Sequence, residues 1–221
     1  MNISQNDKLH FWVSISGEKL KETATLEDAY NFWYKKPRYT DLYDAIANIP
    51  YDKTFARTVH GIGKNPNREK IVRKGKDYVA SRIKTLNVHS EAEFDAWHRE
   101  CVETLIQIFR DGGQKLYIGQ GQKWINMGLK HLFLADEAVL KDILPFCHIP
   151  LDNYLYDALN SKNTPVEFQG LQLPFEPSTK PWSRIDDYDA YLKFQKTFRT
   201  KSKEAPLVAE FNLWQSEKDL K

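Results

Sequence analysis

The side chains best placed to do chemistry form a polar stripe within residues 119–132. Gln122, Asn126 and Lys130 are four residues apart, and Lys123 lies beside them. Residues four apart share one face of a helix, and most other positions of this segment are apolar. A few amide and ammonium groups that converge inside an apolar surrounding are typical of ligand pockets. The stripe is therefore the first candidate for a binding site.

His148 extends this candidate site, and Asp152 beyond Pro150 could form a hydrogen-bonded pair with it. The predicted ligand pocket consists of Gln122, Lys123, Asn126, Lys130 and His148. One alternative is an enzyme with a site near Lys123, Asn126 and His148, although no catalytic role is assigned to any residue. The other is a structural polar network, because buried amides and lysines need hydrogen-bonding partners.

A basic segment between residues 53 and 84 is the second candidate. It carries ten Lys and Arg residues against two acids, an excess of eight positive charges, while the whole chain has a net charge of only +2. Clustered cations near a helix N-terminus suit phosphate groups. The predicted phosphate- or nucleic-acid-binding residues are Arg68, Lys70, Arg73, Lys74 and Lys76. The alternative is a solvated helix face whose cations pair with acids elsewhere in the chain.

Glycines precede both candidate segments but match no phosphate-binding fingerprint. Lys64 follows Gly63, yet the next residue is neither Ser nor Thr and the Walker spacing is absent. Gly119 and Gly121 lack the third glycine and the preceding strand of a dinucleotide fingerprint. A flexible turn is the simpler interpretation of residues 61–65.

Metal ligands and nucleophiles are sparse in this chain. His98 and Cys101 lie one helical turn apart, and Cys147 directly precedes His148, so four groups of the right type exist for a zinc site. Cys101 falls on an apolar stripe, however, and adjacent Cys and His are not a usual ligand spacing. We therefore predict neither a metal site nor a cofactor.

Three stretches of the chain carry a resemblance to other sequences. They are residues 119–130 (GQGQKWINMGLK), 147–152 (CHIPLD) and 182–192 (WSRIDDYDAYL). Through them the chain, from about residue 28 onward, resembles a family of uncharacterised bacterial proteins. The resemblance implies a bacterial or mobile-element source. It brings no activity, cofactor or catalytic residue.

Helical patterns dominate the elements that must position these residues. Phe94, Trp97, Cys101 and Leu105 recur at spacings of three and four, which predicts a helix over residues 90–111. Caps, glycines and prolines delimit further helices, at residues 25–36, 40–49, 66–86, 119–132, 151–160, 183–201 and from 206 onward. The predicted fold is all-α: a single compact, non-repeating domain of eight or nine helices, with at most a short strand pair.

The two ends of the chain differ in organisation. Residues 1–24 are expected to form an N-terminal extension, and residues 25–221 a single helical domain. Strand-like patterns are confined to residues 9–15 and 166–173. Residues 161–181 contain four prolines and few periodic apolar positions, which predicts an irregular loop. A loop of that length is a candidate for partner contact.

Composition and hydropathy indicate which classes of protein the chain does not resemble. No apolar run approaches the roughly 18 residues of a membrane span, and the N-terminus lacks the apolar region of a signal peptide. Two cysteines do not make a disulfide framework, so a cytoplasmic location without a membrane partner is predicted. The favoured hypothesis is a soluble bacterial protein that binds nucleic acid or a phosphorylated ligand through the basic helix. The alternative is a non-catalytic protein–protein interaction module that uses the loop 161–181.

Overall fold

The computed structural model describes residues 3–16, 20–21 and 23–218, and the regular elements in these ranges are helices and helical turns. The predicted all-α, single-domain fold is confirmed. The α-helices are α1 (Gln5–Ile15), α2 (Leu26–Tyr34), α3 (Leu42–Pro50), α4 (Arg68–Lys84), α5 (Glu91–Asp111), α6 (Ile118–Ala135), α7 (Glu137–Leu140), α8 (Asn153–Leu159), α9 (Tyr188–Lys201) and α10 (Pro206–Lys218). The shorter helical turns are η1 (Tyr51–Phe55), η2 (Ala56–Thr58), η3 (Ile62–Lys64), η4 (Leu144–Phe146), η5 (Val166–Phe168) and η6 (Trp182–Arg184).

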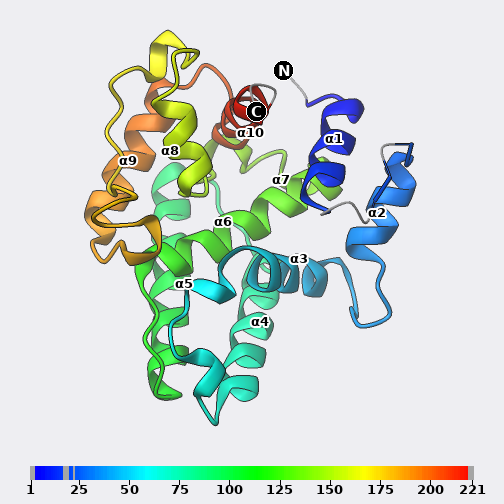
Figure 1. The fold of residues 1–221 in the computed structure, drawn as a ribbon, viewed down its shortest axis with the longest axis vertical. Coiled ribbons are helices and arrows are strands. Elements are labelled where there is room, and N and C mark those ends of the chain that lie inside the picture. Colours follow the sequence, from blue (N-terminus) through cyan, green and yellow to red (C-terminus); the bar gives the residue numbers. More distant parts are fainter. Residues whose placement is uncertain (1–2, 17–19, 22, 219–221) are drawn as a thin grey trace.

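Helix α6 runs through the middle of the molecule, with α1 and α2 on one side and α8 and α9 on the other (Figure 1). Its side chains are buried on every face from Gly119 to Leu134, as expected of a helix in the core of a domain. Helices α3, α4 and α5 pack against it. Trp124 fixes one of these contacts, because its Nε1 donates a hydrogen bond of 2.7 Å to the carbonyl oxygen of Ala47. The polar side chains of α6 therefore meet other core groups rather than bulk solvent.

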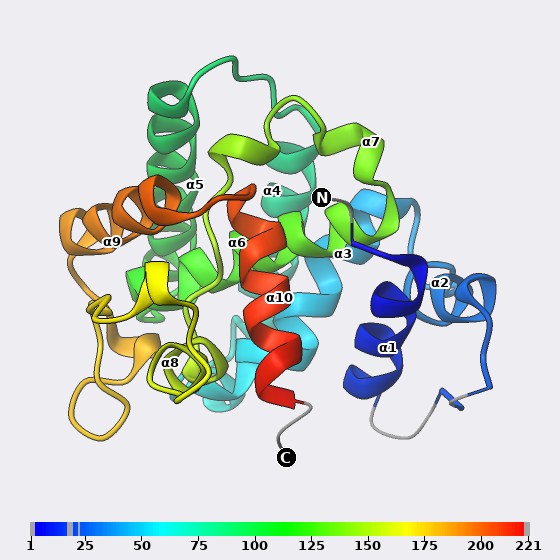
Figure 2. The ribbon, with the colours of Figure 1, turned by 90° about the horizontal axis from the view of Figure 1, so that it is seen from above.

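Helix α10 lies across α6 and returns the C-terminal segment to the core (Figure 2). In that view α8 lies on one side of α10 and α1 on the other. The ring of Phe11 in α1 contacts the rings of Phe211 and Trp214, at centroid distances of 5.7 and 4.9 Å. Helix α1, within the predicted extension 1–24, is thus packed into the common core.

Three helices begin at the predicted caps. Thr25 caps α2 in a capping box with Asp28, Asp41 caps α3, and Ser90 caps α5. Each of these side chains accepts a hydrogen bond from a backbone N–H that helix geometry leaves without a partner. Short polar side chains before apolar periodic segments therefore indicated these three helix starts correctly.

Two expectations for the first 60 residues were wrong. Residues 9–15 show strand-like alternation but belong to α1, whose start is fixed by a capping box between Ser4 and Asp7. Pro50 was expected to lie beyond α3, yet it is the last residue of that helix and the chain continues into η1. Because proline has no backbone N–H, one helical hydrogen bond is missing at Pro50. The π-helical turn η1, with its wider hydrogen-bonding pattern, begins at the next residue.

Two later helix starts also differ from the prediction. Helix α4 begins at Arg68 rather than Pro66, because the Asn65 side chain accepts the backbone N–H of Asn67 at 2.8 Å and holds a turn there. Residues 182–184 form the separate turn η6, and α9 begins at Tyr188 after the cap Asp187. The predicted helix from Ser183 is therefore shorter than expected.

Residues 161–181 are irregular apart from η5 and an isolated bridge between Glu176 and Lys180, which agrees with the predicted loop. The strand-like pattern at 166–173 corresponds to η5, a turn and irregular backbone, and these described residues form no strand. Within the described ranges, no helix is both long and apolar enough to cross a membrane.

Candidate functional site

The polar stripe of α6 divides between two separate environments. Lys123 and Lys130 line a cavity. Gln122 and Asn126 instead bond to each other and to the backbone of residues 149–151. His148 belongs with this second group and does not line the cavity. The five residues predicted as one pocket therefore do not share a single space.

Asn126 lies at the centre of the buried polar network. Its amide nitrogen donates to the hydroxyl of Tyr191 at 2.9 Å and to the carbonyl oxygen of Ile149 at 3.1 Å. Its amide oxygen accepts from Nε2 of His98 at 3.0 Å, which leaves Nδ1 of His98 to accept from the Tyr188 hydroxyl at 2.7 Å. Both ends of the Asn126 amide are thus bonded to protein.

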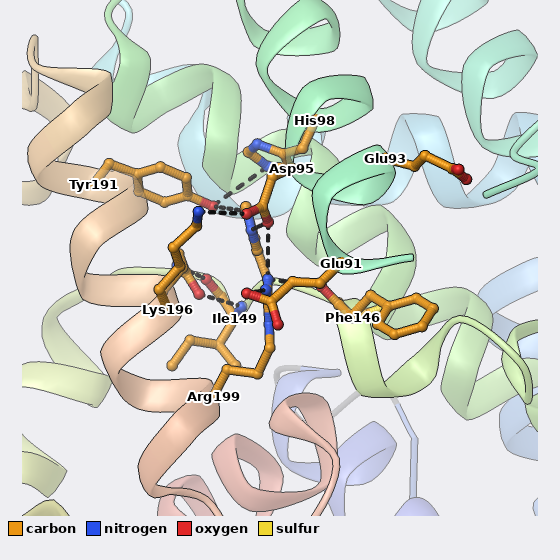
Figure 3. A network of polar contacts seen from close by, with 12 residues as sticks. Glu91, Glu93, Asp95, His98, Phe146, Ile149, Tyr191, Lys196 and Arg199 are labelled. Atoms are coloured by element: carbon orange, nitrogen blue, oxygen red, sulfur yellow. Dashed lines mark hydrogen bonds and ion pairs between the residues drawn. The ribbon is translucent and has the colours of Figure 1, made fainter. Parts of the chain in front are cut away.

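His148 continues this network toward α5 and α9. Its Nε2 donates to Asp95 at 2.9 Å, so its Nδ1 accepts from the hydroxyl of Tyr191 at 3.0 Å. Asp95 also accepts from Nη2 of Arg199 at 3.0 Å, and Nζ of Lys196 lies 3.4 Å from its other oxygen. Figure 3 shows these α5 and α9 side chains pointing toward one another. His148 therefore pairs with Asp95 and not with the nearby Asp152.

Burial keeps the histidines of this network neutral. It lowers the pKa of His148 to about 4 and the pKa of His98 well below its usual value. Burial alone would raise the pKa of Asp95, but hydrogen bonds from His148 and Arg199 outweigh it and lower that pKa to about 2. A neutral imidazole that is bonded at both nitrogens has no free lone pair for taking a proton from a ligand. The network is suited to joining α5, α6 and α9.

Cys101 and Cys147 offer no nucleophile near this network. Both are free and buried. Burial raises the pKa of Cys101 to about 11 and that of Cys147 to about 12, so both remain protonated thiols at neutral pH. Among the described residues, no three His, Cys, Asp or Glu side chains lie together as metal ligands would.

A cavity of about 570 Å³ lies on the side of α6 that carries Lys123 and Lys130. This volume falls within the range of small-molecule sites. Its walls come from eight other elements, α1, α2, α3, η1, η2, α8, η6 and α10, so residues far apart in the sequence meet there. Trp33, Trp182 and Trp214 contribute aromatic surface to these walls. The arrangement combines apolar walls with a small number of charged groups.

Lys123 forms a buried ion pair with Asp152, the N-cap residue of α8. The other oxygen of Asp152 accepts the backbone N–H of Leu155 at 2.9 Å, which fixes the carboxylate. Burial alone would raise the pKa of Asp152, but the charge of Lys123 outweighs it and the pKa is lowered. An ammonium group has three N–H donors, and Asp152 accepts one of them. Lys123 therefore retains donors for a ligand.

Lys130 is enclosed more completely than Lys123. Its Nζ lies 2.6 Å from Glu210 and within 5.0, 5.6 and 5.7 Å of the ring centroids of Phe11, Phe211 and Trp214. Cations over aromatic faces are stabilised by the ring quadrupole. Burial raises the pKa of Glu210 although Lys130 opposes this shift. Lys130 is thus largely occupied by protein groups.

His131 lies at the same end of the cavity as Lys130. Its Nδ1 is 2.9 Å from the hydroxyl of Tyr34, which also accepts from Nε1 of Trp12 at 3.2 Å. Nε2 of His131 is buried and has no hydrogen-bond partner within the described part of the chain. Burial lowers the pKa of His131 to about 3, so the ring is neutral. Unpaired buried polar atoms are uncommon and destabilising, and Nε2 is enclosed by protein rather than exposed to the cavity.

The sequence predicted the two lysines of the cavity as site residues, but it did not predict which residues contact them. Asp152 was considered as a partner of His148, but it is the N-cap of α8, and its pairing with Lys123 depends on where α8 packs. Glu210 follows four apolar residues in α10. An acidic residue isolated in an apolar segment indicates a buried charge that has a partner, so this pattern could have identified Glu210. His131 gave no signal, because only the fold shows which ring nitrogen is unpaired.

The predicted basic site lies on α4. Its exposed members are Arg68, Lys70, Arg73 and Lys74. Among the described residues, none of these four forms an ion pair. Lys76 differs, because it is half-buried and pairs with Asp52 at 2.9 Å. The fold therefore leaves four of the five predicted residues available to solvent, and uses the fifth to hold α4 against η1.

No protein-family model, curated protein or solved structure matches this chain. The resemblance to a bacterial family therefore stays a prediction, and the functional argument depends on the geometry alone.

Proposed function

We propose that the protein binds a small phosphorylated ligand in the cavity beside α6. The observation that carries this proposal is a 570 Å³ cavity with a buried ammonium group, Lys123, that has donors to spare. Aromatic walls supply apolar contact, and a few polar groups orient the ligand, which is the usual composition of a small-molecule site.

The charged residues that line the cavity favour an anionic ligand. They comprise four cations and three carboxylates, and two of the cations, Lys53 and Arg57, are exposed. Exposed cations attract an anion from solution, and a partly desolvated ammonium interacts with it more strongly than in water. Phosphate suits this arrangement because several oxygens can accept charge-assisted hydrogen bonds at once.

Stability alone does not account for the two buried ion pairs of the cavity. Removing Lys123 and Asp152 from water costs about as much as their attraction returns, and the same holds for Lys130 and Glu210. Apolar side chains of similar volume would fill the space equally well. A role in binding gives a reason for buried charges at these positions.

Calorimetric titration at low ionic strength tests the proposal with inorganic phosphate, a sugar phosphate and a mononucleotide. We expect saturable binding of at least one organic phosphate, and Lys123→Met should weaken it about tenfold or more, roughly 1.4 kcal/mol. The control Lys141→Met removes an exposed lysine that does not line the cavity and belongs to no proposed site, so it should leave the affinity unchanged. If no compound in the panel saturates the protein, the proposal is wrong.

A second candidate function is polyanion binding by α4, supported by the exposed and unpaired state of Arg68, Lys70, Arg73 and Lys74. Such binding weakens steeply as salt rises, because counterions are released from the nucleic acid. Titration with short single- and double-stranded DNA and RNA at two salt concentrations should show this dependence. Replacing the four residues by Gln should abolish it without unfolding the chain, whereas binding that survives the replacement rules out α4.

The remaining functional hypotheses receive less support. An enzyme site shared by Lys123, Asn126 and His148 would require them to face one space, and only Lys123 lines the cavity. A protein-interaction role of the loop 161–181 stays a proposal, for which the exposed Val166 is the main structural argument. A cytoplasmic location is likewise proposed, in keeping with two buried free cysteines.

A further inference from the structure

We infer that the phosphorylated ligand of the cavity also carries an ammonium group, which the carboxylates of Glu210 and Asp152 hold. This inference rests on the proposed phosphate-binding function and names the class of compound, a phosphate ester that is also an amine. It is carried by the order of the charged side chains along the cavity, and by carboxylate oxygens there that can accept a further hydrogen bond.

The cavity runs from an exposed rim to a more enclosed interior. Lys53, Arg57 and Tyr154 line it and are exposed, so the opening lies between the η1–η2 segment and α8. Lys130 and Glu210 also line it but are only 2 and 4% exposed, so they belong to its interior. Cations therefore dominate the rim, whereas the interior contains a carboxylate.

The phosphate belongs between the rim and Lys123. Gln120, in the first turn of α6, donates a hydrogen bond of 2.8 Å to the carbonyl oxygen of Thr58. This bond places η2, and with it Arg57, next to the turn of α6 that carries Lys123. Asp152 accepts one of the three N–H donors of Lys123. Two cations thus lie near the outer part of the cavity, and one phosphate can accept charge-assisted hydrogen bonds from both.

The carboxylates of Glu210 and Asp152 provide the matching place for a cation. Glu210 pairs with Lys130 through Oε2, whereas its Oε1 has no hydrogen bond within the described residues and is not enclosed as Nε2 of His131 is. The side chain of Asp152 is 18% exposed, and each of its oxygens accepts one hydrogen bond although each can accept two. Burial raises the pKa of Glu210 and the charge of Asp152 adds to this rise, so the two carboxylates lie within electrostatic range of each other.

A phosphate ester without a cation at its inner end would suit this cavity poorly. The two carboxylates repel an anion, and a ligand that fills the space removes the water that would otherwise bond their oxygens. An ammonium group supplies three donors and a positive charge, so it can bond both carboxylates and reduce their repulsion. A hydroxyl group supplies one donor and no charge. The cavity should therefore select an amine over the corresponding alcohol.

Calorimetric titration of the unmodified protein with matched pairs of compounds tests this selection. The pairs are glucosamine 6-phosphate with glucose 6-phosphate, pyridoxamine 5′-phosphate with pyridoxine 5′-phosphate, and phosphoethanolamine with hydroxyethyl phosphate. We expect at least one amine to bind about tenfold or more tightly than its alcohol. If phosphate esters bind but no amine binds more tightly than its alcohol, the inference is wrong and the proposed function stands. If no phosphorylated compound binds, both are wrong.

Glu210→Gln tests the role of the inner carboxylate. Gln has nearly the same shape and still accepts a hydrogen bond from Lys130, but it lacks the negative charge. The preference for the amine should fall about tenfold, whereas Lys123→Met should weaken binding of the alcohol as well as the amine. The control Asp142→Asn alters an exposed carboxylate that does not line the cavity, so it should leave the preference unchanged.

Asp152→Asn tests the second carboxylate. Asn is also a favourable N-cap residue, so α8 should keep its start, and the preference for the amine should again decrease. This variant decides the matter if Glu210→Gln does not fold. Thermal melting verifies that each variant is folded. Folded variants at either position that retain the full preference for the amine would overturn the assignment of the ammonium group to these carboxylates.

Discussion

The consequence of replacing a buried polar side chain depends on how many partners it leaves behind. Asn126 bonds Tyr191, His98 and the backbone of Ile149, all inside the core. Lys123 has one carboxylate partner, Asp152. These two positions, which are one turn apart on α6, should therefore respond differently to apolar substitution.

Replacing Asn126 by Leu, which has nearly the same shape, should destabilise the protein by about 3 kcal/mol or more. The substitution leaves donors and acceptors of His98 and Tyr191 unpaired in the core, and each such group costs about 1–3 kcal/mol. Urea unfolding measures the effect. The control Asn212→Leu alters an exposed asparagine of α10 and should shift stability by less than about 0.5 kcal/mol. Equal effects of the two substitutions would argue against a tightly bonded network.

The pair Lys130–Glu210 should show strong coupling between its members. Glu210→Leu alone leaves the Lys130 charge buried without its carboxylate, at a cost of about 3–5 kcal/mol, whereas the double variant with Lys130→Met should be close to neutral. A double-mutant cycle from chemical denaturation gives the coupling energy. Additive effects of the two single substitutions would show that the pair is not desolvated as the geometry indicates.

At the residue scale, the sequence predicted individual groups better than their partners. The spacing of Lys123 and Lys130 placed both on a buried helix, and both are buried there. Glu210 lies 80 positions from Lys130 in the sequence, and Tyr34 lies 97 positions from His131. Local periodicity contains no information about such contacts, since they depend on how α1, α2 and α10 pack.

At the scale of elements, the approach of η6 to the first turn of α6 depends on a glycine. A Cβ at position 119 would lie 1.8 Å from the carbonyl oxygen of Trp182. The backbone N–H of Gly119 also donates to the carbonyl oxygen of Ile185 at 3.0 Å. The absence of a side chain at Gly119 therefore allows the backbones of α6 and η6 to lie in close contact. This contact positions Trp182, which lines the cavity.

Gly119→Ala should destabilise the protein by about 2 kcal/mol or more, because a backbone atom cannot move aside as a flexible side chain can. It should also weaken ligand binding through displacement of Trp182. The control Gly63→Ala introduces a methyl group where no atom lies within 4 Å, and it should leave the melting temperature nearly unchanged. Thermal unfolding compares the two. A stable Gly119→Ala variant would mean that η6 relaxes away from α6 without cost.

Element boundaries could be predicted where the signal was local. Thr25, Asp41 and Ser90 cap helices at the expected positions because a cap acts only on the next few residues. The start of α9 was misplaced because two polar candidates, Ser183 and Asp187, compete within five residues. The separation of η6 from α9 is decided by the contact with α6, which local sequence does not contain.

At the scale of the whole molecule, three buried neutral histidines make the fold sensitive to acid. His98, His131 and His148 come from α5, α6 and the segment before α8, and burial lowers each pKa, to about 3 for His131 and about 4 for His148. The same groups titrate near 6.5 in the unfolded chain. Between these values the unfolded chain binds more protons, so stability falls as pH falls.

Unfolding free energy should therefore decrease from pH 7 toward pH 4.5, by up to about 1.4 kcal/mol per pH unit for each histidine. Glu210 offsets part of this loss, because its raised pKa makes the folded state bind a proton first. Below pH 4 the lowered pKa of Asp95 adds a further loss. Urea midpoints measured at half-unit intervals test the slope. A flat profile from pH 7 to 4.5 would show that these histidines are solvated.

The two buried cysteines make it possible to measure how fast separate parts of the core open. Cys101 and Cys147 are enclosed in different parts of the core, and neither thiol ionises readily there. A thiol reagent can therefore modify each one only during the moments when its surroundings separate and solvent enters. Labelling rates followed by mass spectrometry would time the opening around α5 and around the segment before α8 independently. Equal rates would mean that the domain opens as one cooperative unit, and unequal rates would identify the part that opens first.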